Sequence, residues 1–131
     1  MKIIYYDSGN VTNINTSKLD TEKIFTEVKE LCANTTEIIR VYVGKERLDQ
    51  LKKDEKGLEI ILEKEIEINS PAAGKYTVKK IFFPLSGDFI GNAESPVITV
   101  FMGKDKYYAT AFRNMNGYGK LKKLEKVILG K

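Results

Sequence analysis

The 131-residue chain has no histidine or tryptophan, only three prolines, and a single cysteine, Cys32. Without histidine, the commonest general base and the commonest metal ligand are both missing, and no Ser/His/Asp or Cys/His catalytic set can form. One cysteine excludes an intramolecular disulfide and a multi-cysteine metal site. We therefore expect a protein that is not an enzyme, with no metal and no cofactor, in which Cys32 is a small buried apolar residue.

Long apolar runs are also missing. No stretch approaches the roughly 18 apolar residues that a membrane span requires. The apolar run after Lys2 ends at Asp7, too early for a secretory signal. The chain length suits one domain over residues 1–131, and 42% hydrophobic with 31% charged residues is typical of a globular protein. These features predict a cytoplasmic domain.

Acidic residues are scarce in the second half of the chain. Residues 1–70 carry 11 Lys/Arg against 14 Asp/Glu, a net charge of −3, and residues 71–131 carry 11 against 4, a net charge of +7. A basic half can bind a polyanion. The alternative is that the lysines are solvated and the two halves intermix in the fold.

The periodicity of apolar residues predicts most elements. Residues 2–6 are expected to form a first strand, 8–16 a polar loop, and 19–33 an amphipathic helix that starts near Ser17 and Asp20. Residues 37–43 have strand character, and 45–56 form either a short surface helix or a long excursion. Leu121, Leu124, Val127 and Ile128 predict a short amphipathic C-terminal helix.

Residues 58–68 carry the clearest pattern in the chain. Five of the six even positions are apolar and four of the five odd positions are glutamate, which predicts a long antiparallel strand with one solvated face. Residues 76–83 are the expected return strand. Matching faces would place Tyr76, Val78 and Phe82 with the apolar set, against the helical stripe Ile24, Val28 and Leu31.

Two further strands are expected at 97–102 and 107–112, joined as a hairpin that is apolar on both faces. Such a hairpin belongs in the centre of a sheet or beneath a partner. The predicted fold is α+β: one domain with a mainly antiparallel sheet of about five to six strands, an N-terminal amphipathic helix packed on it, and a short C-terminal helix.

An acidic stripe is the first candidate binding surface. Fixed carboxylates on one strand face suit a basic protein partner. The loop that follows the return strand adds two apolar side chains between glycines, a composition found in interface hot spots. The predicted partner-binding residues are Glu59, Glu63, Glu65, Glu67, Asp88, Phe89, Ile90 and Asn92. The alternative is a solvated strand face that Lys79 partly neutralises.

Aromatic and cationic residues of the C-terminal half form an alternative binding surface. Tyrosine rings can stack on bases and lysines can bind phosphates of a single strand. The same residue types also occur in protein interfaces. This surface comprises Tyr107, Tyr108, Arg113, Tyr118 and Lys120.

Lys64 and Lys80 interrupt the apolar face of the long hairpin. Two ammonium groups in a core are costly without anions. Either they line an anion-binding pocket between sheet and helix, or the helix leaves this end of the sheet open and the lysines reach solvent.

The layout resembles the small cytoplasmic immunity proteins of bacterial polymorphic and contact-dependent toxin systems. The matching features are the short first strand and helix, the acidic strand ending in Glu63-Lys64-Glu65-Ile66-Glu67, the aromatic hairpin and the Gly/Asn loops. The resemblance implies a non-enzymatic domain that binds and inhibits a toxin, and no residue roles carry over. The alternatives are a nucleic-acid-binding module and a small-ligand-binding domain with a pocket between helix and sheet.

Overall fold

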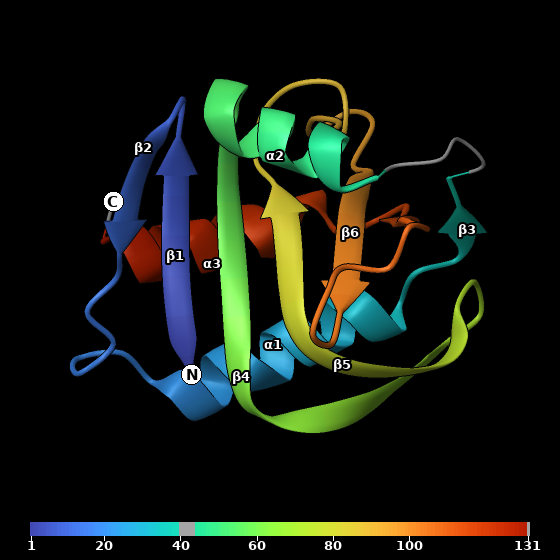
Figure 1. Cartoon of the computed structure of the whole chain (residues 1–131), viewed down its shortest axis with the longest axis horizontal. Coiled ribbons are helices and arrows are strands. Elements are labelled where there is room, and N and C mark those ends of the chain that lie inside the picture. Colours follow the sequence, from blue (N-terminus) through green and yellow to red (C-terminus); the bar gives the residue numbers. More distant parts are fainter. Residues whose placement is uncertain (40–43, 131) are drawn as a thin grey trace.

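The computed structural model describes residues 1–39 and 44–130 of the chain. Within these residues, seven strands form one antiparallel sheet in the order β2-β1-β4-β5-β6-β7-β3, accompanied by three helices (Figure 1). The α+β antiparallel fold predicted from the sequence is confirmed. The strands are β1 Lys2–Asp7, β2 Asn10–Asn13, β3 Glu37–Ile38, β4 Lys56–Ser70, β5 Gly74–Pro84, β6 Ile98–Gly103 and β7 Phe112–Asn114; the helices are α1 Thr21–Ala33, α2 Lys45–Asp54 and α3 Tyr118–Leu129.

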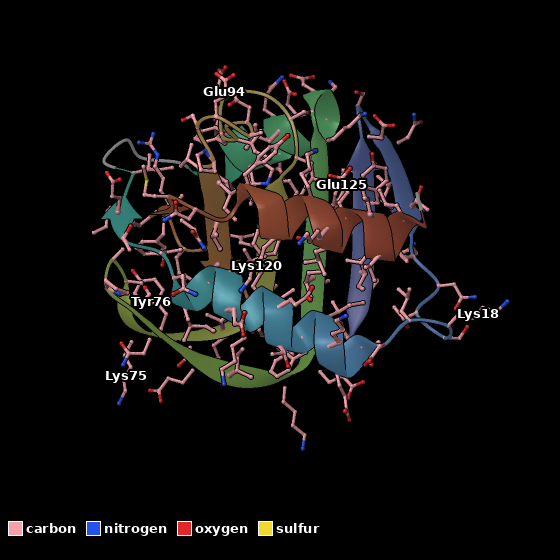
Figure 2. The ribbon with its side chains drawn as sticks, turned by 180° about the vertical axis from the view of Figure 1, so that it is seen from behind. Lys18, Lys75, Tyr76, Glu94, Lys120 and Glu125 are labelled. Atoms are coloured by element: carbon pink, nitrogen blue, oxygen red, sulfur yellow. The ribbon has the colours of Figure 1, made fainter. Side chains whose placement is uncertain are left out.

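The helices cover both faces of the sheet. Helices α1 and α3 lie side by side on one face (Figure 2), and α2 crosses the other face (Figure 1). The larger core lies between the sheet and the α1/α3 pair. It contains the predicted stripe of α1 and the even-numbered apolar residues of β4, so this prediction is confirmed. Cys32 is fully buried in the same core, as expected.

The start of the chain differs in detail from the prediction. Residues 10–13, expected within a loop, form β2 and pair with β1. Ser8 and Gly9 both have positive φ, at 50° and 92°, which gives the tight turn that this pairing requires. Asp20, and not Ser17, caps α1, because its Oδ1 accepts a hydrogen bond from the Lys23 N–H at 3.1 Å.

Helix α2 resolves the alternative left open for residues 45–56. It buries Leu48 and Leu51 and exposes most of its charged residues. Together with Ile4, Phe82 and Phe101, these leucines form a second, smaller core. Of the strand expected at 37–43, the structure has β3, Glu37–Ile38; residues 40–43 lie outside the described residues.

The pairing of β4 with β5 shifts its register near the middle of the hairpin. Ile61 pairs with Lys80 and Ile66 pairs with Val78, so four residues of β4 lie opposite one residue of β5, Lys79. On β4, even-numbered apolar residues face the α1-side core on both sides of the shift. On β5, the residues that face this core are even-numbered up to Val78 and odd-numbered from Ile81 onward. Beyond the shift the hairpin bends and its tip runs toward β3 (Figure 1).

The register shift overturns two predictions for β5. Phe82 belongs to the core under α2 and not to the α1 face, and Lys80 lies on the α2 side of the sheet, away from Lys64. The sequence pattern assumed an unbroken alternation between the two strands, and a bulge inverts that alternation.

The predicted aromatic hairpin is only partly regular. All six residues of β6 are buried, as expected for a central strand. The chain after it makes one isolated bridge, between Gly103 and Tyr107, and resumes as a strand only at Phe112. A Cβ atom at Gly103 would lie 2.4 Å from the Lys106 carbonyl oxygen, so this turn requires glycine. None of the helices formed by the described residues has the length and apolar character of a membrane span.

Candidate functional site

The structure divides the acidic stripe into two environments. Glu59 is 5% exposed and lies beneath α2, so its predicted place on a solvated face is wrong. Strand pairing fixes its position, because Glu59 lies between Ile4 of β1 and Phe82 of β5. Glu63, Glu65 and Glu67 are exposed. Of the four predicted glutamates, these three are accessible to a partner.

Three donors surround the Glu59 carboxylate. Oε1 accepts from the Tyr6 hydroxyl at 2.8 Å, and Oε2 accepts from the Tyr107 hydroxyl at 2.6 Å and from Lys52 Nζ at 3.1 Å. Burial alone would raise the pKa of Glu59, but the hydrogen bonds from Tyr107 and Tyr6 and the Lys52 charge outweigh it and lower the pKa. Glu59 is therefore an ionised carboxylate within the fold.

The Glu59 carboxylate also affects the tyrosine and lysine side chains that surround it. Burial and the neighbouring carboxylate raise the pKa values of the Tyr6 and Tyr107 hydroxyls, which keeps both as donors. Lys52 Nζ lies 5.1 Å and 5.6 Å from the ring centroids of Tyr6 and Tyr107. Since Glu59 is bonded to residues of β1, α2 and the segment after β6, it ties three distant segments together.

The exposed glutamates each form an ion pair. Glu63 accepts from the N-terminal amine at 3.0 Å, Glu65 pairs with Lys104 at 3.2 Å, and Glu67 pairs with Lys75 at 3.7 Å. Hydrogen bonding to the N-terminal amine lowers the pKa of Glu63. Exposed ion pairs of this kind contribute little to stability, so a partner could replace them at little cost.

A shallow groove of about 440 Å³ lies beside these glutamates, between α1 and β4. Pairing with β1 ends at Ile61, so β4 continues past the edge of its neighbour. The apolar lining comprises Met1, Phe25, Leu62 and Ile66. The charged lining comprises the carboxylates of Glu22, Glu63 and Glu65, the Lys64 ammonium and the N-terminal amine. The groove thus combines an apolar floor with a small excess of negative charge.

The loop after β5 does not present free apolar anchors. Phe89 packs edge-on against Phe101, with ring centroids 5.8 Å apart, and Arg47 Cζ lies over the Phe89 ring, 5.4 Å from its centroid. Ile90 bridges to Ile98 and packs on the α1-side core. Both side chains are half-buried. Asp88 and Asn92 are exposed, and the Asn92 side chain accepts hydrogen bonds from the N–H groups of residues 94 and 95.

The alternative aromatic and basic surface is spread over the molecule. Tyr107 faces Glu59 beneath α2, whereas Tyr108 packs against Tyr76 and donates to the Thr77 carbonyl. Tyr118 and Lys120 lie on α3, where Lys120 pairs with Glu30 of α1 (Figure 2). Arg113 is exposed on β7. These residues do not form one continuous surface.

A cavity of about 530 Å³ lies between α2, the sheet and the segment 104–109. Its lining includes four lysines: Lys45, Lys52, Lys80 and Lys106. Lys80 Nζ lies 4.7 Å from the centre of the Tyr107 ring and donates to the Asp105 carbonyl at 2.9 Å. The predicted placement of Lys64 and Lys80 on the same face of the sheet is wrong, because Lys64 lines the groove on the other side of the sheet.

The sequence reading missed this cavity and the Glu59 cluster. One signal was present: Phe82, Phe101 and Ile61 are apolar residues at positions that alternate away from the main core, which indicates a cover on the second face. No residue pattern links Glu59 to Tyr6, 53 positions away, or to Tyr107, 48 positions away.

Neither the groove nor the cavity resembles a metal centre. Among residues 1–39 and 44–130, no group of three or more Cys, Asp or Glu side chains is placed to hold a metal ion. Burial raises the pKa of the Cys32 thiol, which disfavours the reactive thiolate.

Comparisons with protein-family models, with curated proteins and with solved structures found no match for the chain. The residues and their geometry are therefore the basis for any functional assignment.

Proposed function

We propose that the protein is a non-enzymatic protein-binding domain, an immunity protein that neutralises a cognate bacterial toxin by direct contact. The observation that supports this proposal is the groove beside β4. Its floor offers Phe25 and Ile66 as half-buried apolar side chains, and Glu63 and Glu65 stand at its border. An apolar centre with a charged border is the usual composition of a protein interface.

The chemistry of the groove defines the partner. Three carboxylates against two ammonium groups favour a partner segment that carries both apolar and basic side chains. The groove is open and shallow, which suits a protein surface better than a small molecule. Glu63 and Glu65 lie in the short stretch of β4 between the paired residues Ile61 and Ile66, so the central sheet holds both ends of the segment that carries them.

The test needs a toxin domain, which the proposal expects to be encoded in a neighbouring gene. Co-expression should restore growth of cells that produce that domain. Reversing Glu63 and Glu65 to lysine should slow association by about tenfold at low salt, with a smaller change in dissociation. Phe25→Ala should instead speed dissociation. Surface plasmon resonance at two salt concentrations separates these effects.

The matched control reverses two exposed glutamates far from the groove, Glu46 on α2 and Glu94 in the loop before β6. The net charge changes equally in both double variants. Equal effects of the two reversals would show a general charge effect and contradict the groove as the interface. A failure to restore growth would contradict the inhibitor role itself.

A nucleic-acid-binding role has weaker support, because Tyr107 and Tyr108 contact different cores and the remaining residues lie elsewhere. It makes an opposite prediction: the glutamate reversals would strengthen binding of an oligonucleotide, and binding would fall steeply with salt.

A further inference from the structure

The cavity under α2 is a second candidate site, separate from the groove of the proposed function. Its 530 Å³ falls within the usual range for small-molecule sites, roughly 300–1,000 Å³. It combines apolar and aromatic walls with a few charged groups, which is also typical of such sites. Leu48, Phe101, Tyr107 and Tyr108 supply the apolar and aromatic lining.

The charges of the cavity favour an anion. Four lysines and two aspartates line it, an excess of two positive charges. Lys45 pairs with Asp49 at 3.7 Å, and Lys52 pairs with Glu59. Among the described residues, Lys80 and Lys106 have no carboxylate within ion-pair distance. Their ammonium groups outnumber the remaining Asp105 carboxylate.

The buried Glu59 fixes the shape of the cavity. It binds both Lys52 and Tyr107, two of the lining side chains, at 3.1 Å and 2.6 Å. Burying a charged group is costly, and an apolar residue of similar size would often stabilise a fold equally well. A buried carboxylate that holds two cavity side chains is therefore better explained by their positioning than by stability.

The aromatic lining indicates the body of the ligand. The Tyr107 ring is held on one side by its bond to Glu59 and is approached on its face by Lys80. A planar ring bound beside Tyr107 would gain aromatic contacts, while its anionic group would reach Lys80 and Lys106. Helix α2 also begins here: Gly44 lines the cavity and gives no side-chain cap to the first turn.

We propose that this cavity binds a small aromatic anion, with Lys80 and Lys106 contacting the anionic group and Tyr107 contacting the ring. Phenyl phosphate is the probe. Phenol, which has only the aromatic ring, and inorganic phosphate, which has only the anionic group, are the comparison ligands. Titration of the full chain, followed by ¹H–¹⁵N NMR, should show saturable shifts for residues of α2 and of the segment 104–109. Phenyl phosphate should bind at least about tenfold more tightly than either half.

Two lysine variants test the assignment. The double variant Lys80→Gln/Lys106→Gln should weaken phenyl phosphate binding by about tenfold or more. The control Lys123→Gln, on the exposed side of α3, should leave it within about twofold. Thermal unfolding of the double variant shows whether loss of the Lys80 contacts has altered the fold. If it has, Lys106→Gln alone, at an exposed residue, should still weaken binding severalfold.

Three results would overturn the proposal: no saturable binding of phenyl phosphate at millimolar concentration, shifts confined to lysines outside the cavity, or equal affinity in the lysine variants and the control. None of these measurements depends on the groove, so the two sites can fail separately.

Discussion

The two faces of the sheet are built differently. The face under α1 and α3 forms a core of twenty buried apolar residues of the described chain. The face under α2 buries eight, and among them lies the Glu59 cluster with its tyrosines and lysine. The first face has the composition of a core that stabilises the fold. The second face buries fewer apolar residues than the first and contains a polar cluster and a cavity instead. Such a composition is typical of a region that positions side chains for binding.

Two adjacent residues of β4 make this comparison testable, because Ile60 points to the α1 face and Glu59 to the α2 face. Ile60 is fully buried. Ile60→Ala should lower the free energy of unfolding by about 2–5 kcal/mol, through lost apolar burial and the cavity left behind. Chemical denaturation measures it. The exposed Val127 of α3 is the control: Val127→Ala should change stability by less than about 0.5 kcal/mol.

The second expected effect is smaller and lies on the α2 face. Glu59→Gln keeps the size of the side chain but removes its charge. It also replaces one carboxylate oxygen by an amide NH2 group, a hydrogen-bond donor that would face donors such as Lys52 and Tyr107. We expect a loss of about 1–3 kcal/mol in the free energy of unfolding, the range for a buried polar group left without a partner. Glu63→Gln, at an exposed position, should have little effect. Equal losses in both variants would show that burial of Glu59 has no energetic consequence.

The smallest expected effect is a dependence on pH. The pKa of Glu59 is lowered in the fold, so its ionised form stabilises the native state. This stability is fully present above the ordinary glutamate pKa of about 4.3 and is lost as the pH falls through the lowered native pKa. One group contributes at most about 1.4 kcal/mol per pH unit.

Denaturation between neutral pH and pH 3 measures the effect, with Glu59→Gln as the reference. The stability difference between the wild type and this variant should shrink on acidification, while the other carboxylates titrate in both proteins. Parallel stability curves would contradict an ionised, stabilising Glu59.

Sequence reasoning worked best where one physical pattern decides the outcome. The alternation in residues 58–68 predicted both the strand and its buried face, because successive side chains of a strand point to opposite sides. The core partners on α1 followed from its helical stripe, and the structure confirms them.

The α2 side of the molecule could not be derived in the same way. α2 has only two buried apolar residues, Leu48 and Leu51, so few positions in the sequence indicate its buried face. With no visible cover for the second face, Glu59 was placed with the solvated glutamates. Its partners come from distant segments, and their convergence depends on the packing of α2, which no local pattern encodes. The groove partly matches the predicted acidic surface, through Glu63 and Glu65.

Because four residues of β4 lie opposite one residue of β5, the two halves of this hairpin do not share a single alternation. A change in sequence or length at the exposed residues 63–65 can be absorbed at the irregularity without moving Ile60 or Ile81 in the core. These residues can therefore diversify during evolution while the paired residues on either side of them stay constant. In a family of such domains, sequence and length variation should concentrate between residues 63 and 65, at the border of the groove that we assign to the partner.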